Sequence, residues 1–295
     1  MKYASRRSNL LRVRKHEGLG FSIFVHIFMT VFILLCVLPF IHVIALSFSG
    51  AGYAIGLIPH GVTLYSYNVV FEDSGFFQAF GMSLMVAVVG TLLSVLVNFL
   101  AAYALSKRDL PFRRFFNCFF VIIMLFSGGI IPNFLWYRII GLVDTPIILI
   151  LPMAVQFYYI MLMTTYLENL PQSIEDAACV DGAGKLTLLW YIIMPMAVPI
   201  ILTVALYTLV GYWNNYQLAL YYLPTRTEYY PLSMFILNFI NGSAINDYVG
   251  DIEKANHKDN IEAALIVLSV IPIIISYPFS LKYIVKGSFV GAVKE

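Results

Sequence analysis

The chain has 295 residues, of which 60% are hydrophobic and 12% are charged, and its mean hydropathy is +0.84. Soluble proteins carry about 25% charged residues, so this chain cannot cover a normal water-facing surface. The composition excludes a soluble enzyme and predicts an integral membrane protein without a nucleic-acid partner. The 3 cysteines are too scattered for a disulfide framework or a metal site.

Residues 1–20 form a basic segment in front of the first apolar run. Its cations are Lys2, Arg6, Arg7, Arg12, Arg14 and Lys15. Positive charge beside a span favours the cytoplasmic side, so we expect a cytoplasmic N-terminal segment here. The apolar run at 21–46 is too long for the core of a cleaved signal peptide and is interpreted as a retained first span.

Five further apolar runs predict five more spans. We expect them at residues 82–105, from 115 with a kink near 127–132, at 146–166, at 188–212 and at 261–284. Asn98 is the one strongly polar side chain deep in the second span. Gln156 lies in the middle of the fourth, and an amide in hydrocarbon is costly unless it faces protein or water.

The cations set the orientation. Of the 18 Lys and Arg residues, all fall in segments that we expect inside except Arg138, Arg226, Lys254 and Lys258. The positive-inside rule then predicts an all-α integral membrane protein with six transmembrane helices and both termini cytoplasmic. Residues 47–78 and a long polar segment up to Asn260 should lie outside.

A polar stretch at 171–187, between the fourth and fifth spans, has a helix-forming pattern. Ser173 can cap the N-terminus of a helix, with Asp176 as its acidic partner three residues later. Gly182 and Gly184 should end that helix. A second helix should start near 186 and enter the membrane, bent by two prolines.

This stretch resembles the cytoplasmic coupling loop of bacterial ABC-importer permeases. The family pattern is Glu-Ala-Ala, three residues, Gly, nine residues, Ile, any residue, Leu-Pro, and the matching positions here are Asp176, Ala177, Ala178, Gly182, Ile192, Met194 and Pro195. Asp176 replaces the family's Glu while Glu175 precedes it, so the pattern leaves open which acid makes the contact. The run at 180–183 is similar to the sugar-transporting branch.

The resemblance extends over the runs at 126–135, 141–145 and 281–294, as in maltose-type and polysaccharide-type permeases. It implies a permease domain at 21–285, with its coupling loop at 171–187, and a cytoplasmic tail at 286–295. The positions that it assigns to ATPase coupling are Glu175, Asp176, Ala177, Ala178, Asp181, Gly182 and Pro195.

The resemblance also implies a multi-pass protein of the bacterial inner membrane that imports oligosaccharides or related carbohydrates. Its partners would be a second homologous permease subunit, two ATPase subunits and an extracytoplasmic solute-binding protein. The chain itself would hold no cofactor, because ATP and magnesium would be bound by the partner ATPase.

Polar and aromatic side chains suit a carbohydrate pathway, because sugar C–H faces stack on rings and hydroxyls need hydrogen-bond partners. The candidates are Gln156, Tyr158, Tyr212, Trp213, Asn214 and Tyr216. For each ring taken singly, a place in an interfacial aromatic belt is an equal alternative.

Other classes of membrane protein find less support. A secondary transporter would need membrane-embedded charge for ion coupling, and a channel would need a selectivity ring. An intramembrane enzyme would need a nucleophile with a base, and we identify no catalytic or metal-binding residues. A six-span secondary transporter or channel, or an ABC permease for a non-sugar solute, remain the alternatives.

Overall fold

The computed structural model describes residues 19–50, 56–59, 61–126, 128–242 and 256–291, and these ranges contain helices and no strand. The long helices are α2 (Leu19–Ser47), α4 (Ser74–Ser106), α12 (Val198–Asn214) and α16 (Lys258–Gly291). Most of the predicted N-terminal segment, the end of the tail and Lys254 lie outside the described residues.

Shorter helices connect the long ones. They are α3 (Tyr65–Glu72), α5 (Arg113–Leu125), α6 (Ile130–Ile139), α8 (Phe157–Glu168), α9 (Gln172–Val180), α13 (Gln217–Tyr222) and α14 (Leu232–Ile240). Single turns are α7 (Leu151–Ala154), α10 (Lys185–Thr187), α11 (Met194–Met196), the 3₁₀ turns η2 (Pro146–Leu149) and η4 (Thr227–Tyr229), and the π-helical turn η3 (Leu188–Ile193).

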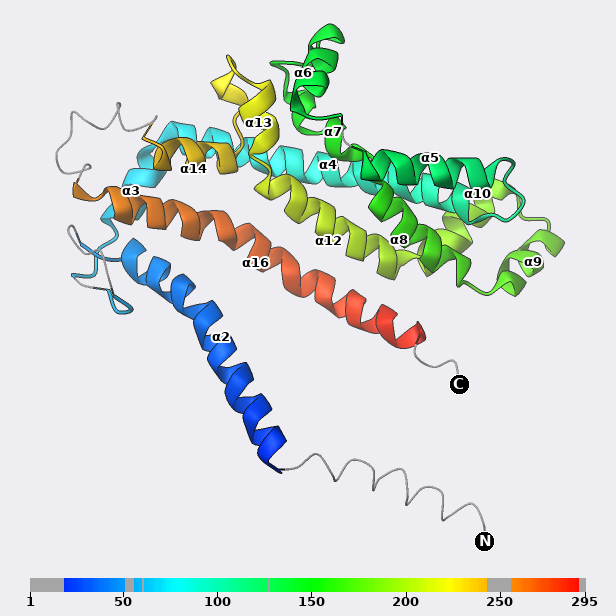
Figure 1. Ribbon diagram of the computed structural model, residues 1–295, viewed down its shortest axis with the longest axis horizontal. Coiled ribbons are helices and arrows are strands. Elements are labelled where there is room, and N and C mark those ends of the chain that lie inside the picture. Colours follow the sequence, from blue (N-terminus) through cyan, green and yellow to red (C-terminus); the bar gives the residue numbers. More distant parts are fainter. Residues whose placement is uncertain (1–18, 51–55, 60, 127, 243–255, 292–295) are drawn as a thin grey trace. The chain divides into compact units, whose positions relative to one another are not determined.

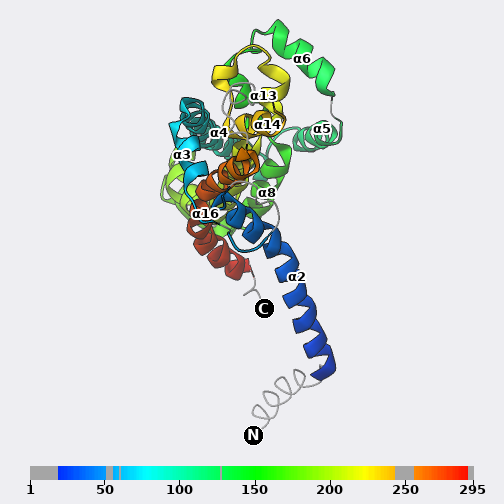
Figure 2. The same cartoon turned by 90° about the vertical axis from the view of Figure 1, so that its left-hand side faces the viewer.

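Three helices are long and apolar enough to cross a membrane: Gly20–Ser47, Ser74–Ser106 and Lys258–Pro278. Three helix pairs also qualify if each is one bent span. These are α5 with α6 (112°), Pro146–Ala154 with α8 (44°), and Lys185–Met196 with α12 (75°). The described part of the chain therefore holds three to six candidate spans, and Figure 2 shows the sharp turn between α5 and α6.

Two of these bends were predicted. The third span breaks between Leu125 and Ile130, and the last of the three pairs bends at Ala197, between Pro195 and Pro199. Neither proline can donate a backbone hydrogen bond inside a helix, which accounts for the bend at that place.

Two expectations were wrong, and a third is refined. The fourth candidate span runs over Pro146–Ala154 and Phe157–Glu168, but the two parts are bent by 44° because Val155 and Gln156 between them are extended. Ser173 is not an N-cap: α9 begins at Gln172, and its N-cap is Pro171, two residues earlier, without a side-chain hydrogen bond. The polar segment up to Asn260 includes the apolar helix α14, whose run Leu232–Ile240 buries residues against the rest of the chain.

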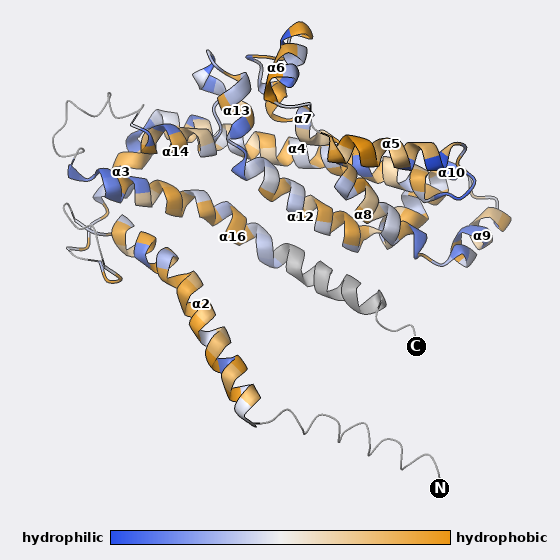
Figure 3. Cartoon of the chain, in the orientation of Figure 1, coloured by the Kyte–Doolittle hydropathy of each residue, from blue (hydrophilic) through white to orange (hydrophobic). Residues whose placement is uncertain are grey.

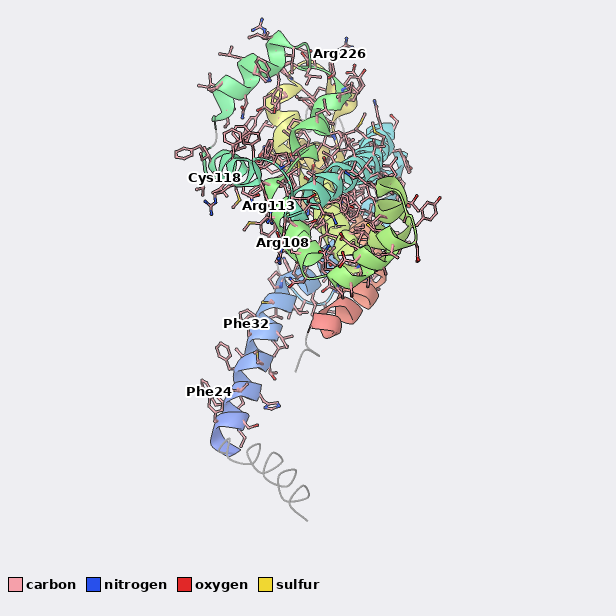
Figure 4. All side chains as sticks on the ribbon, turned by 90° about the vertical axis from the view of Figure 1, so that its right-hand side faces the viewer. Phe24, Phe32, Arg108, Arg113, Cys118 and Arg226 are labelled. Atoms are coloured by element: carbon pink, nitrogen blue, oxygen red, sulfur yellow. The ribbon has the colours of Figure 1, made fainter. Side chains whose placement is uncertain are left out.

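The chain divides into two compact units, and each is described by itself. Unit 1 comprises Met1–Asn68 and Ile252–Val267. Near the C-terminal end of α2, the Asn260 side chain donates to the carbonyls of Leu46 (2.9 Å) and Ser49 (3.1 Å). Most of α2 is exposed and apolar (Figure 3), and Phe24 and Phe32 project from it (Figure 4). Such a helix is suited to lipid or to another membrane chain.

Unit 2 comprises Val69–Asp251 and Leu268–Glu295. Helix α4 is its centre, in contact with α12 along one side and with α7 and α8 along another. Helix α14 packs against the first turns of α4, where the Leu232 N–H donates to Ser83 Oγ at 2.7 Å. Helix α9 lies at the opposite end of α4 (Figure 1).

The tightest approach in unit 2 joins α4 to α12. Gly90 has no side chain, and the Tyr212 ring fills the place where one would stand: a Cβ on Gly90 would lie 2.7 Å from Tyr212 Cζ. That ring is 2% exposed. The two helices can therefore pack at this distance only because residue 90 is glycine.

Replacing Gly90 tests this packing. We expect Gly90→Ala to destabilise the folded chain by about 1–3 kcal/mol, the usual cost of overpacking a core, and to lower its thermal unfolding temperature in detergent. Gly81→Ala is the matched control on the same helix, because nothing lies within 4 Å of its Cβ position. Equal unfolding temperatures for the two variants would contradict this account.

Candidate functional site

Helix α9 is closed by Gly182. This residue has φ +79°, a left-handed conformation that costs other L-residues roughly 1–2 kcal/mol. Its N–H donates to the Cys179 carbonyl at 3.1 Å, and the Ala183 N–H donates to the Ala178 carbonyl at 2.9 Å. The turn thus pairs carbonyls that the end of a helix leaves free, which confirms that the glycine ends α9.

One face of α9 is attached to the rest of unit 2. Ala178 is 8% exposed and belongs to a buried core that includes Leu105 of α4, Leu167 of α8 and Leu189 of η3. The small side chain of Ala178 lets α9 lie close to the ends of α4 and α8 and to η3. The second alanine of the coupling pattern is therefore a packing residue.

Two ion pairs tie this region to the loop that follows α4. Lys107 pairs with Glu175 of α9, and Arg113 pairs with Glu168 at the end of α8. The Lys107 ammonium also lies 4.5 Å from the centre of the Tyr103 ring. Figure 4 labels Arg108 and Arg113 in this basic region. Glu175 is thus occupied within its own chain.

The other face of α9 makes no such contact with the described residues. Asp176, Ala177 and Val180 are exposed, and Val180 lies beside both of the others on the helix surface because it follows Asp176 by four residues and Ala177 by three. Val180 is 88% exposed, and Leu186, beyond the Gly182 turn, is 72% exposed. This surface is both acidic and apolar, and the helix that carries it is fixed through the opposite face by Glu175 and Ala178. Asp181, at the end of the helix, is exposed as well.

A second polar arrangement surrounds the break in the fourth span. Val155 and Gln156 are extended, and the fully buried side chain of Asn98 lies against them. Asn98 Nδ2 donates to the Ala154 carbonyl and Asn98 Oδ1 accepts from the Gln156 N–H, both at 3.1 Å. The polarity of Asn98 was evident from the sequence, but its partner was not.

Two of the six pathway candidates lie in the interior of the chain. Tyr212 donates to the Ile150 carbonyl at 2.9 Å. The Trp213 indole N–H donates to the Ser269 carbonyl at 3.0 Å, and its ring meets Phe80 edge-on. Both side chains are less than 5% exposed. They therefore pack α12 against α4, α16 and the fourth span.

The other four candidates have accessible side chains. Tyr158 is 55% and Tyr216 is 38% exposed. Asn214 is exposed and Gln156 is half-buried. Asn215, which was not a candidate, accepts from the Leu218 N–H at 3.0 Å and so caps α13.

The end of unit 2 opposite α9 carries a polar turn. Asp144 Oδ1 accepts from the Thr225 N–H at 3.2 Å, and Arg226 pairs with Glu228 at 3.0 Å. A backbone hydrogen bond and then the Arg226 contact hold the pKa of Glu228 below its usual value. In the view of Figure 4, Arg226 is labelled above Arg108 and Arg113.

Comparison with known proteins decides the family. The model of the family "Binding-protein-dependent transport system inner membrane component" matches residues 99–289. The chain belongs to this family. It is therefore an inner-membrane permease component of a binding-protein-dependent ABC importer, the ATPase is a separate subunit, and the permease carries no cofactor of its own. The family that the sequence pattern indicated is confirmed.

Individual relatives cover nearly the whole chain. The polygalacturonan/rhamnogalacturonan transport system permease protein YtcP of Bacillus subtilis (strain 168) is 34% identical over 93% of this chain and 98% of its own. The arabinooligosaccharides permease protein AraQ of Halalkalibacterium halodurans is 27% identical over 88% of this chain and 92% of its own.

A solved structure agrees with the fold. A chain of a bacterial ABC transporter involved in the import of the acidic polysaccharide alginate superposes with a TM-score of 0.85 at 29% identity, over 91% of this chain and 98% of that chain. The permease fold of that transporter is thus the fold of this chain.

Proposed function

We propose that this permease component imports oligosaccharides or fragments of polysaccharides, and that α9 is the element through which a separate ATPase drives it. The observation that carries the coupling is the division of α9 into two faces. Ala178 and Glu175 fix one face to the chain, while Asp176 and Val180 present the other to a partner.

This division assigns the two acids different roles. Glu175 orients the helix through Lys107, and Asp176 meets the ATPase. Ala177 lies on the docking face beside Asp176, Asp181 and the Gly182 turn close the helix, and Pro195 belongs to the bend that follows. A displacement of α9 would pass as a rigid-body movement through the core that Ala178 shares with α4, α8 and α12.

We further propose six spans with both termini cytoplasmic. Each bent pair is then one span, α9 with the basic loop at 107–114 faces the cytoplasm, and the turn at 225–230 faces outward. The positive-inside rule supports this orientation. The transporter would be completed by a second homologous permease, two ATPase subunits and an extracytoplasmic solute-binding protein.

The carbohydrate assignment rests on the relatives, whose names refer to galacturonan, arabinan-derived and alginate substrates. Within the chain, we propose that the solute meets Gln156, Tyr158, Asn214 and Tyr216. Tyr212 and Trp213 would act on the pathway by holding α12 in place, since they are buried within the chain.

The coupling proposal predicts different results at neighbouring acids. Asp176→Asn should weaken ATPase association about tenfold, since a hydrogen bond to a charged group is worth about 1.5 kcal/mol or more. The measurement is the affinity of the purified permease complex for its ATPase. As control, the exchanged pair Lys107→Glu with Glu175→Lys should retain association. The reverse pattern would assign the contact to Glu175.

The topology proposal is tested by labelling single cysteines in a variant in which Cys36, Cys118 and Cys179 are replaced. Cysteines introduced at Val62 and Thr227 should react with an impermeant thiol reagent added outside intact cells, and one introduced at Ser173 should react only after the cells are opened. All three positions are exposed. Labelling of residue 173 from outside would overturn the six-span orientation.

The solute proposal predicts a selective transport defect. A strain without this chain should lose uptake of labelled oligosaccharides from pectin, arabinan or alginate, and should keep uptake of phosphate and amino acids. Restoring the chain should restore uptake. If only a non-sugar solute is lost, the carbohydrate assignment is wrong although the permease assignment stands.

A further inference from the structure

The fourth candidate span contains two extended residues at the break between α7 and α8. Val155 has φ −113° and ψ 116°, and Gln156 has φ −132° and ψ 115°. An extended pair cannot continue the hydrogen bonds of a helix. In a membrane, non-helical backbone is tolerated only where it is buried in protein or lines a water-filled cavity.

The first condition is met on the side of the break that faces α4. On the inner side, Asn98 uses its amide nitrogen for the Ala154 carbonyl and its amide oxygen for the Gln156 N–H. On the other side, Val155 is 53% exposed. The break is therefore hydrogen-bonded to α4 on one side, and Val155 is exposed on the other.

Asn98 is itself held in position. Its side chain is fully buried, and Nδ2 also donates to Ser94 Oγ, one turn earlier on α4, at 2.9 Å. An amide offers a donor and an acceptor at the same time. A leucine at position 98, although similar in size, could form a hydrogen bond with neither the Ala154 carbonyl nor the Gln156 N–H.

The outer end of α7 is also fixed. The Ile150 carbonyl accepts from Tyr212 of α12, and Asn215 Nδ2 lies 2.9 Å from Met153 Sδ. The four-residue helix Leu151–Ala154 is thus held at both ends by polar side chains of α4 and of the α12 end. These contacts preserve the break instead of allowing one continuous helix.

We propose that Asn98 is a positioning residue for transport: by keeping Val155 and Gln156 extended, it presents their backbone and the Gln156 amide to a water-accessible path for a polyhydroxylated solute. Hydroxyl groups need both donors and acceptors, and an interrupted helix offers them where an intact one does not. The proposal rests on the proposed solute pathway and adds Asn98 to it.

The first test is the accessibility of the break in the assembled transporter, in membrane vesicles and without native cysteines. Val155→Cys should react with a small cationic methanethiosulfonate. Leu92→Cys is the matched control, since Leu92 is 67% exposed but lies in the unbroken helix α4. A rate at residue 155 no higher than at residue 92 would overturn the proposal.

The second test adds changes at Asn98 to the Val155→Cys variant. Asn98→Leu should lower the reaction rate of the thiol at position 155 about tenfold, because the break loses both of its buried hydrogen bonds. Asn98→Asp keeps the acceptor for the Gln156 N–H and should give an intermediate rate. Ser94→Ala removes only the hydrogen bond from Asn98 to Ser94, and its thiol reaction rate at position 155 should stay within about twofold of that of the Val155→Cys parent. An unchanged rate in Asn98→Leu would show that Asn98 does not hold the break.

Uptake measurements separate positioning from general stability. Asn98→Asp should raise the apparent KM for the transported oligosaccharide more than it lowers the maximal rate, at equal amounts of assembled complex. An equal loss of both, or a fall in the maximal rate alone, would contradict a positioning role. Thiol labelling needs no ATP hydrolysis, so the coupling proposal and this one can fail separately.

Discussion

The structure depends on one constraint: in hydrocarbon, backbone N–H and C=O groups must find partners within the protein. The long helices satisfy this internally. Where helices are interrupted, buried side chains supply the partners, as Asn98 does beside Gln156 and Tyr212 does at Ile150. Polar residues inside the candidate spans therefore stabilise the interruptions, because they form hydrogen bonds with backbone groups there.

The same arrangement connects α9 with the break in the fourth candidate span, both within unit 2. Helix α4 carries Asn98 at the break in the fourth span and, farther along, Leu105 in the core that holds α9. Helix α8 runs from the break to Glu168, whose carboxylate pairs with Arg113. A displacement of α9 would thus reach the break through packed helices that move as rigid bodies.

The surfaces divide according to their surroundings. Helices α5 and α6 have no buried residue, and α2 exposes phenylalanine, leucine and isoleucine along most of its length. In water such faces would drive aggregation, but in a membrane they meet lipid or another permease. The exposed face of α9, by contrast, combines the acid Asp176 with the apolar Val180.

The sequence by itself determined the membrane class, the approximate positions of the candidate spans and the end of α9 at Gly182, because these follow from composition, hydropathy and local backbone preference. The resemblance of positions 176–195 to a known pattern indicated the family. Only the tertiary structure decided that Glu175 is paired and Asp176 is exposed, since Lys107 lies far from Glu175 in the sequence. It also decided that Tyr212 and Trp213 are interior and that the fourth span is broken. Both depend on partners from other helices, such as Gly90 and Asn98 of α4, and no local pattern specifies such contacts.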